Sequence, residues 1–424
     1  MTKYSQTFHA AIFATLSMCL LYLLHLLPIN QLFIDPFSEA IKQHDIMDIA
    51  FSKFRDHNKL ELFEKRIIII NSGITNREKL ATTINLVNNK GARAIGLDLI
   101  LDTLYNNRSD SLLRDEMQKA NGKIVLGYTL DEKAHHITTS IHEHSIPFFS
   151  DGLKEAYVNL ATNDGFSVRA YVPFLKNQNE LKPAFSTQLA NMLDTTVLEI
   201  LQKRDHEIEW INFKRIQPGE RSMVFPINSK RNVHYIQMDM DKFIADSSVY
   251  DAAYFTDKIV LIGFCGETAN SFSMSDRYFT PLNQQYTGRS LPDMYGVVIH
   301  ANIISMLLEK SFINEIPHAI IYILCFSIFF INFFCFTQII IRYKKMQGLY
   351  IRTFQFLEFL FCFCIAIILL SYCNLKLGFF FMATCIVLSF ELFTIYEREL
   401  DSFFEHRIAK LWKTEKKLKN SSTK

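Results

Sequence analysis

Four stretches of this chain are long and apolar enough to cross a membrane, and this feature limits its possible folds most. A helix needs about 20 apolar residues to span a hydrocarbon core of roughly 30 Å. The four stretches are residues 10–27, 320–341, 354–372 and 377–396. Each is apolar all round, whereas a soluble helix keeps a polar stripe at helical spacing. We therefore expect four transmembrane helices; the alternative is that one of them is a buried core helix.

The first stretch can be either a cleaved signal peptide or a permanent anchor. Its charged start consists of Lys3 alone, and its apolar run is longer than that of an ordinary signal peptide. No small-x-small cleavage motif follows, and Pro28 begins a polar boundary instead. The sequence favours an uncleaved anchor.

Basic residues in the short connections set the orientation. The link after the second stretch carries Arg342, Lys344, Lys345 and Arg352, whereas the next link holds Lys376 alone. Because cytoplasmic loops are enriched in Lys and Arg, the first link and the basic tail belong in the cytoplasm. We expect the N-terminus (1–9) and tail (397–424) to be cytoplasmic and residues 28–317 to form one large extracytoplasmic domain.

Composition excludes some classes of function. The 424 residues contain 45 Lys plus Arg against 43 Asp plus Glu, a net charge of +2. A nucleic-acid-binding protein normally needs a clustered basic surface, so we expect no nucleic-acid partner. Of the eight cysteines only Cys265 lies in the large domain, which therefore has no internal disulfide and depends on its core.

The large domain alternates apolar runs with helical patterns. Strands are expected at Arg66–Asn71, 91–100, 122–127, 221–227 and 257–263, and helices at 76–90, 109–120, 183–201 and 303–310. Continuous apolar strands that alternate with helices are typical of a parallel sheet covered on both faces. The predicted fold class is an α/β ectodomain with a mostly parallel sheet flanked by helices, plus four transmembrane α-helices.

The histidines of residues 131–150 raise the question of a metal site. His135, His136, His142 and His144 are not spaced as a helical H-x-x-x-H pair. A polar loop or hairpin is the preferred interpretation, and we expect no metal and no cofactor.

A candidate ligand site lies where the expected strands end. Asp98 and Asp102 follow one strand, and Glu267 and Thr268 lie on the turn after another. Ligands of open α/β sheets bind at this carboxyl edge. The same pocket can include further residues, which are Asp276 on a nearby loop, His300 and Asn302 at the start of a helix, and Arg169 as a partner for one of the carboxylates.

The alternative is purely structural. Asp98 and Asp276 would then accept backbone hydrogen bonds in turns, and His300 would be a satisfied interior histidine. The turn after Gly263 can present N–H groups to an anion, but it matches no nucleotide-binding motif. No nucleophile–base arrangement emerges, so we expect the protein not to be an enzyme.

Three polar residues within the spans are candidates for membrane assembly. Gln338, Glu358 and Glu391 lie near the cytoplasmic ends of the expected helices. Polar groups inside a span tend to face a bundle interior or a partner. Both glutamates can instead reach the interface, since each is close to the boundary.

The tail is expected to continue the last helix. Its apolar residues repeat at coiled-coil spacing and could contact a partner: Phe404, Ile408, Leu411, Trp412 and Leu418. A basic amphipathic helix on the anionic inner leaflet is an equally good interpretation.

The ordered motifs of the large domain resemble the CHASE2 family of bacterial extracytoplasmic sensor domains. The matching segments are 91–102 (GARAIGLDLILD), 164–169 (DGFSVR), 185–190 (FSTQLA), 224–228 (VFPIN), 257–263 (DKIVLIG), 276–281 (DRYFTP) and 292–309 (PDMYGVVIHANIISMLLE). The arrangement of one span before the domain and three after it is also similar to that of the family. The resemblance implies a sensor input in the bacterial inner (cytoplasmic) membrane, with its large domain in the periplasm or outside.

Two functions remain open. In typical members of the family the last span leads into a kinase or a nucleotide cyclase, whereas here the residues after Tyr396 are too few for a catalytic domain. One hypothesis is a non-enzymatic sensor or adaptor that relays a ligand or partner signal through the bundle and tail to a separate effector, within a homo-oligomer or hetero-complex. The other is a docking subunit of a cell-envelope membrane complex.

Overall fold

A computed structural model describes most of the chain, which forms two compact units. The described residues are 3–26, 45–55, 63–74, 76–133, 136–160, 167–177, 180–214, 234–268, 273–283 and 291–400. One unit combines residues 1–38 with 314–424, and the other comprises residues 39–313. The expected strand at 221–227 and the tail candidates Phe404, Ile408, Leu411, Trp412 and Leu418 lie outside the described residues.

The 39–313 unit is built on a seven-stranded, mostly parallel sheet. The path of hydrogen-bonded neighbours is β10-β1-β11-β2-β3-β4, and β5 also pairs with β3. Every pair is parallel except β3 with β4. The strands are β1 (Phe63–Asn71), β2 (Ala94–Asp98), β3 (Ile124–Lys133), β4 (His136–Glu143), β5 (Lys154–Tyr157), β10 (His234–Asp239) and β11 (Ile259–Gly263).

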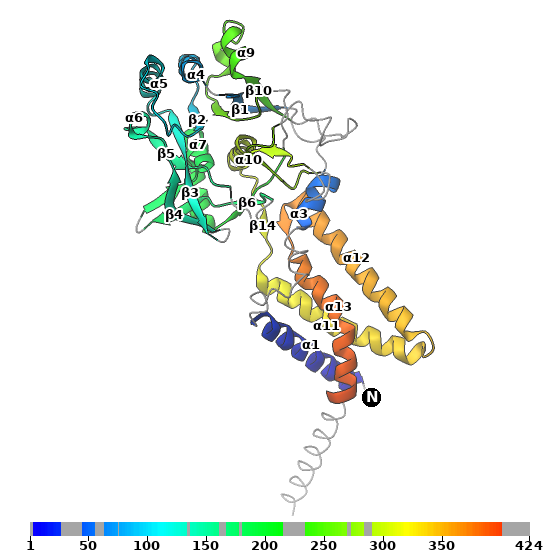
Figure 1. Ribbon diagram of the computed structural model, residues 1–424. Coiled ribbons are helices and arrows are strands. Elements are labelled where there is room, and N and C mark those ends of the chain that lie inside the picture. The colour runs from blue at the N-terminus through cyan, green and yellow to red at the C-terminus, as the bar shows by residue number, and fades with distance from the viewer. Residues whose placement is uncertain are drawn as a thin grey trace, which may run out of the picture. The chain divides into compact units, whose positions relative to one another are not determined.

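Helices cover both faces of this sheet (Figure 1). On one face Ile68, Ile95 and Val260 pack in a core with α4, α5 and α9, while α7 and α10 contact the opposite face. Both faces are therefore dry, which explains why the strands are apolar without alternation. The helices of this unit are α3 (Ile46–Ile49), α4 (Arg77–Asn89), α5 (Arg108–Lys119), α6 (Pro147–Ser150), α7 (Phe185–Leu193), α8 (Thr196–Arg204), α9 (Met240–Ala245) and α10 (Gly296–Glu309).

Shorter elements complete the unit. They are the single turns η2 (Ala50–Phe54) and η5 (Ala252–Tyr254), and the small strands β6 (Ala170–Tyr171), β7 (Phe174–Asn177), β8 (Glu180–Pro183), β9 (Glu209–Trp210), β12 (Arg277–Tyr278) and β13 (Met294–Tyr295). These strands pair as β6–β9, β7–β8 and β12–β13, each antiparallel.

Local sequence explains where the helices begin. The side chain of Asn76 accepts hydrogen bonds from the N–H groups of Glu78 and Lys79 at the start of α4. The side chain of Asn107 accepts from the N–H of Asp110 at the start of α5. Asparagine is a preferred N-cap residue because it satisfies N–H groups that lack a helical partner. The α/β fold with a mostly parallel sheet flanked by helices, expected from the sequence, is confirmed.

Two expectations about the helices were wrong in detail. The helix expected at 183–201 is two helices, because Asp194 turns back to accept from both the N–H and the hydroxyl of Thr196. The last helix of the unit starts at Gly296 rather than Ile303. Its β-branched run favours a strand locally, but burial between neighbouring elements overrides that preference.

The second unit contains four long apolar helices. They are α1 (Lys3–Leu26), α11 (His318–Arg342), α12 (Gln347–Cys373) and α13 (Phe379–Ile395), and α13 is followed by the turn η6 (Tyr396–Leu400). All four are long and apolar enough to cross a membrane. The short parallel pair β14 (Asn314–Glu315) and β15 (Leu375–Lys376) joins the starts of α11 and α13.

The first apolar helix packs into this unit. Phe13 of α1 is fully buried, and its ring lies 5.9 Å from that of Phe329 and 6.0 Å from that of Phe393. His9 Nδ1 lies 2.8 Å from the hydroxyl of Tyr396. The two ends of the chain therefore contribute to one helical bundle.

Candidate functional site at the carboxyl edge of the sheet

Asp98 lies at the carboxyl end of the central strand β2. In the parallel register it is paired with Gly263, the last residue of β11, which is in turn paired with Asn71 of β1. Gly263 leaves room here, because a Cβ on it would lie 3.1 Å from the Cβ of Asp98. The Asp98 carboxyl group thus stands at the edge where α/β proteins bind ligands.

Asp276 reaches the same edge from the segment just before β12. Its backbone φ is +55°, and its carbonyl accepts a hydrogen bond of 3.0 Å from the N–H of Gly296. The carboxylate lies against Gly296, where an added Cβ would be 2.9 Å from Oδ1. The start of α10 therefore needs glycine at position 296 to admit this carboxylate.

His300 is buried one turn further into α10. Its Nδ1 lies 2.7 Å from the hydroxyl oxygen of Ser186, and it also bonds the backbone of Val158. The ring of Phe185 packs edge-on at 5.3 Å. Burial lowers the pKa of His300 to about 4, so the imidazole is neutral. Its hydrogen bonds make His300 a well-satisfied interior histidine with one side on the cleft.

Together these residues line a cleft of about 600 Å³, which we call the carboxyl-edge cleft. That volume is typical of small-molecule sites. Its polar lining consists of Asp98, Thr129, Glu132, Asn159, Asp276, Tyr278 and His300, and its apolar lining includes Leu99, Val158, Leu160 and Phe264. The sequence-based pocket of Asp98, Asp276 and His300 is thus one continuous surface.

The cleft favours protonated carboxyl groups. Burial, followed by repulsion from Asp276, raises the pKa of Asp98 to about 8. Desolvation also raises the pKa of Asp276 to about 6, and hydrogen bonds from Tyr278 and Gly296 offset part of that rise. Asp276 is exposed as a whole residue, but its carboxylate faces Gly296 and Tyr278. The pKa values of Asp98 and Asp276 are therefore both raised. In the described part of the chain no Lys or Arg forms an ion pair with either carboxylate.

The other predicted site residues lie elsewhere. Asp102, Glu267 and Thr268 are exposed and do not line the cleft. Asn302 is buried, and its amide donates to the carbonyl of Val298 and accepts from the N–H of Lys214, which is a structural role.

Arg169 does not pair with a cleft carboxylate. Its Nε and Nη2 donate to the two carboxylate oxygens of Asp48 at 3.0 and 2.8 Å. The expectation was wrong because the carboxylate that pairs with Arg169 is that of Asp48. The two residues lie 121 positions apart, so no local sequence pattern predicts their contact.

Several cleft residues were missed by sequence reasoning. Tyr278 hydrogen-bonds to Asp276, and its position two residues later in the same motif was the available signal. Glu132 comes from the β3–β4 hairpin, where Asn159 donates to it at 3.0 Å. Asn159 also brackets Leu130, accepting from its N–H and donating to its carbonyl. These contacts depend on long-range pairing, so no local pattern indicated them.

In the turn after β11, the side chain of Asn71 already binds the backbone groups that an anion would need. The amide of Asn71 accepts from the N–H of Cys265 at 2.8 Å and donates to the carbonyl of Gly266 at 3.1 Å. An anion at this turn would have to displace Asn71. In the histidine-rich region β4 pairs with β3, and His142 lies 3.1 Å from Asp131, while His135 lies outside the described residues. Among the described residues no three His, Cys, Asp or Glu side chains gather as metal ligands.

The polar residues of the helical bundle are joined within the chain. Asn332 donates to Glu358 and to Ser389, each at 3.1 Å, and Gln355 donates to Ser389 at 3.2 Å. Arg352 pairs with Glu391 at 2.6 Å. Gln338 is exposed on α11. Both glutamates are thus supported by neighbouring helices of the same chain.

Comparison with known proteins identifies the family. The CHASE2 domain matches residues 16–340, which is most of the chain. Neither the curated proteins nor the solved structures include a match to this chain. An extracytoplasmic sensory domain together with four long apolar helices indicates a membrane protein. The chain therefore belongs to the CHASE2 family of extracellular sensory domains.

Proposed function

We propose that this protein is a non-enzymatic membrane sensor whose carboxyl-edge cleft binds a small ligand outside the cytoplasm. Ligand binding changes the 39–313 unit, and the change passes through the four-helix unit and the tail to a separate cytoplasmic effector. The protein lies in the inner membrane with both termini in the cytoplasm and works within an oligomer or a hetero-complex.

The observation that carries this proposal is the pair of carboxyl groups without a cationic partner. A fold gains nothing from two acidic groups held in a desolvated cleft, since burial raises the pKa of both carboxyl groups and the charge of Asp276 raises that of Asp98 further. A ligand that brings positive charge or hydrogen-bond donors would relieve that cost. Titratable residues that lie in a cleft with a strongly shifted pKa, at a cost to stability, often mark a functional site.

The helical unit offers a route for the relay. Glu358, Asn332, Ser389 and Gln355 form one hydrogen-bonded chain across α11, α12 and α13. Hydrogen bonds between helices in a membrane are directional, so a shift of one helix changes its partners on the others. This series of hydrogen bonds supports a helical bundle that transmits the signal rather than one that only anchors the protein.

A docking subunit of an envelope complex is the competing function. A docking platform would present a broad apolar patch. The exposed large apolar side chains described in the 39–313 unit are spread over separate elements, for example Ile74, Ile141 and Val249. Single exposed apolar residues are normal, so they give no support to the docking function.

The test uses the full chain in neutral-lipid nanodiscs. Wild type, the double variant Asp98→Asn/Asp276→Asn and the control Asp115→Asn, at an exposed residue of α5, are incubated with the fraction below about 1 kDa of a cell-envelope extract, then studied by native mass spectrometry and thermal unfolding. We expect a small molecule that wild type and control retain and the double variant does not, with a rise in Tm larger by about 3 °C in wild type and control than in the double variant.

Two results would contradict the proposal. One is a wild-type protein that retains no small molecule beyond those that the double variant retains equally well. The other is recovery of the chain from mild detergent only as part of a permanent, stoichiometric envelope complex, which would establish the docking function instead.

A further inference from the structure

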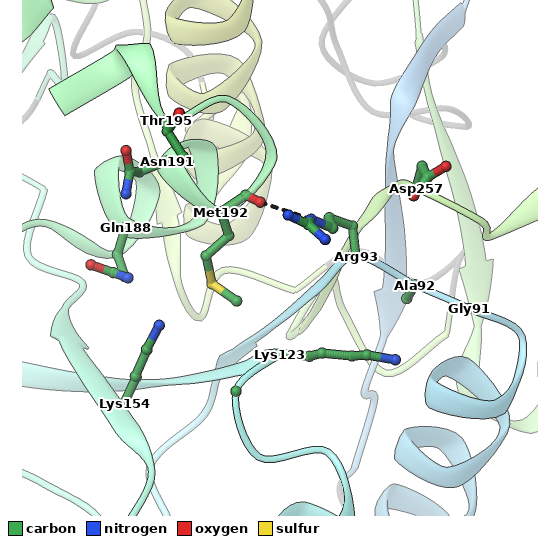
Figure 2. A pocket seen from close by; sticks show the side chains of 11 residues that line it. Gly91, Ala92, Arg93, Lys123, Lys154, Gln188, Asn191, Met192, Thr195 and Asp257 are labelled. Carbon is green, nitrogen blue, oxygen red and sulfur yellow. Dashed lines mark hydrogen bonds between the residues drawn. The ribbon is translucent and has the colours of Figure 1, made fainter. Parts of the chain in front are cut away.

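A second pocket lies at the opposite, amino edge of the same sheet (Figure 2). It has a volume of about 510 Å³, and we call it the amino-edge pocket. Arg93 and Lys123 immediately precede strands β2 and β3, and Lys154 is the first residue of β5. Because these strands are parallel neighbours, their starting residues meet at one edge. Three cationic residues thus line one hollow.

The Lys154 side chain lines the amino-edge pocket and has no described partner. Its side chain forms no hydrogen bond or ion pair with the described part of the chain. Figure 2 shows Lys154 pointing toward Gln188 of α7, whose amide is likewise without a described partner. Lys123 points the other way, and its ammonium donates to the side-chain oxygen of Asn88 at 3.0 Å. Of these two lysines, only Lys154 is available to a ligand.

Arg93 is both fixed and available. Its Nε donates to the carbonyl of Met192 at 3.1 Å, near the end of α7. Its two terminal nitrogens have no other partner in the described part of the chain. A guanidinium anchored through Nε keeps the geometry that binds a carboxylate or phosphate in a bidentate manner.

The electrostatic balance favours an anion. Asp257 is the acidic residue of the lining, set against Arg93, Lys123 and Lys154. The end of α7 contributes a partial negative charge of about half a unit, but Arg93 already donates to the carbonyl of Met192 there. Helix α8 begins beside it, with Thr195 as its N-cap, and contributes the opposite sign. The full charges of Arg93 and Lys154 outweigh these helix ends.

The neutral lining adds a second feature. The amide oxygen of Asn191 is buried and has no hydrogen-bond partner. In Figure 2 this oxygen points away from Gln188 and Lys154, whereas the amide nitrogen of Asn191 points toward them. A ligand hydroxyl group can therefore accept from the Asn191 nitrogen, and Gln188 and Thr195 offer further polar contacts on the same wall.

We propose that the amino-edge pocket binds a small, water-soluble, hydroxylated anion such as a sugar phosphate or sugar acid. Arg93 and Lys154 bind the phosphate or carboxylate group, and Gln188, Asn191 and Thr195 bind the hydroxyl groups. The site is separate from the carboxyl-edge cleft and gives the ectodomain a second input of opposite charge.

Calorimetric titration of the full chain in neutral-lipid nanodiscs tests this site, with glucose 6-phosphate, inorganic phosphate and glucose as probes. Glucose 6-phosphate should bind more tightly than inorganic phosphate, and glucose should not bind. Lys154→Gln should weaken glucose 6-phosphate binding about tenfold, as expected for the loss of one charge-assisted contact. The matched control Lys123→Gln removes the same charge from the same lining and should change affinity by less than about twofold.

The outcomes separate this site from general charge attraction and from lipid binding. Equal losses in Lys154→Gln and Lys123→Gln would mean general attraction by positive charge, and absence of glucose 6-phosphate binding would overturn the proposal outright. If nanodiscs with anionic lipid abolish binding by competition, a lipid headgroup occupies the pocket and the soluble ligand is wrong. The Asp98→Asn/Asp276→Asn variant should bind the probe normally, so failure of the carboxyl-edge cleft would not affect this result.

Discussion

The two ends of one parallel sheet have opposite chemistry. Strand β2 is preceded by Arg93 and ends at Asp98, so about 16 Å of one strand separates the basic pocket from the acidic cleft. At the carboxyl edge the acids face each other without a cation, whereas at the amino edge the cations have one opposing acid, Asp257. The residues that flank buried strands can therefore define two sites while the strands themselves supply only the core.

Helix α7 is shared by both ends. Ser186, near its start, bonds His300 beside the acidic cleft, and Gln188 and Met192 line the basic pocket. A change in the position of this helix would alter both sites together. Substitutions on and beneath α7 can therefore distinguish two independent ends from two ends that the helix joins.

Substitution at Gly96 should have the largest effect on both ends. A Cβ at Gly96 would lie 2.6 Å from a Leu189 methyl, 2.8 Å from the Phe185 ring and 2.9 Å from a Leu261 methyl, so these buried side chains, two of them on α7, must repack. Gly96→Ala should lower the free energy of unfolding by about 2 kcal/mol. Urea unfolding followed by the fluorescence of Trp210, in a Trp412→Phe background, measures it. Unchanged stability would mean that α7 is not seated on the sheet as described.

Ser186→Ala should have a smaller effect, confined to the acidic end. The substitution leaves a buried imidazole nitrogen of His300 without its hydroxyl partner, at a cost of about 1.5 kcal/mol. Glucose 6-phosphate affinity at the amino edge should stay within about twofold if the two ends are independent. A parallel loss of affinity would show instead that α7 couples them. Ser186→Thr, which keeps the hydroxyl, is the matched control.

The pH dependence of stability should identify the acidic end. Above pH 6.5 the unfolded chain releases the last half-proton of His300, whose folded pKa is lowered to about 4, and this raises stability slightly; the raised pKa of Asp276, about 6, lowers stability slightly, so the two small effects largely offset each other. Between pH 6.5 and 8, folded Asp98 keeps a proton that the unfolded chain has lost, because its folded pKa is raised to about 8. The folded state then binds more protons, so stability falls as pH rises, by about 1 kcal/mol over this window.

Asp98→Asn removes the group that titrates. The stability of this variant should therefore change much less between pH 6.5 and 8 than the stability of wild type. Asp257→Asn at the other edge should keep the wild-type slope. Tyr278 and Glu132 also face the carboxyl pair, and both remain in the two variants. An identical slope in Asp98→Asn and wild type would show that Asp98 is not held protonated in the cleft.

How far the sequence predicted this molecule depended on the range of the contacts. Buried runs such as Ile67–Ile70 and capping residues such as Asn76 are local signals, so the α/β class and most elements were predictable. Asp98 and His300 were also predictable, because strand ends and helix starts point to an edge. Glu132 and Asn159 were not, since the pairing of β3 with β4 and with β5 brings them to the cleft. The amino-edge pocket was missed because Arg93, Lys123 and Lys154 lie far apart in sequence and are ordinary as single residues.

The long apolar helices offer the contrast of a carboxylate that has its own cation. Glu391 pairs with Arg352 at 2.6 Å, and both side chains are more than half exposed. A Leu substitution of either residue leaves the other charge without its partner, whereas the double variant Arg352→Leu/Glu391→Leu removes both charges. Such an exposed pair should give a coupling energy of about 0.5 kcal/mol in a double-mutant cycle on thermal unfolding, the smallest of these effects. Self-association should be unchanged in the double variant if the pair acts within one chain. A loss of copurifying subunits would show that Glu391 instead serves assembly.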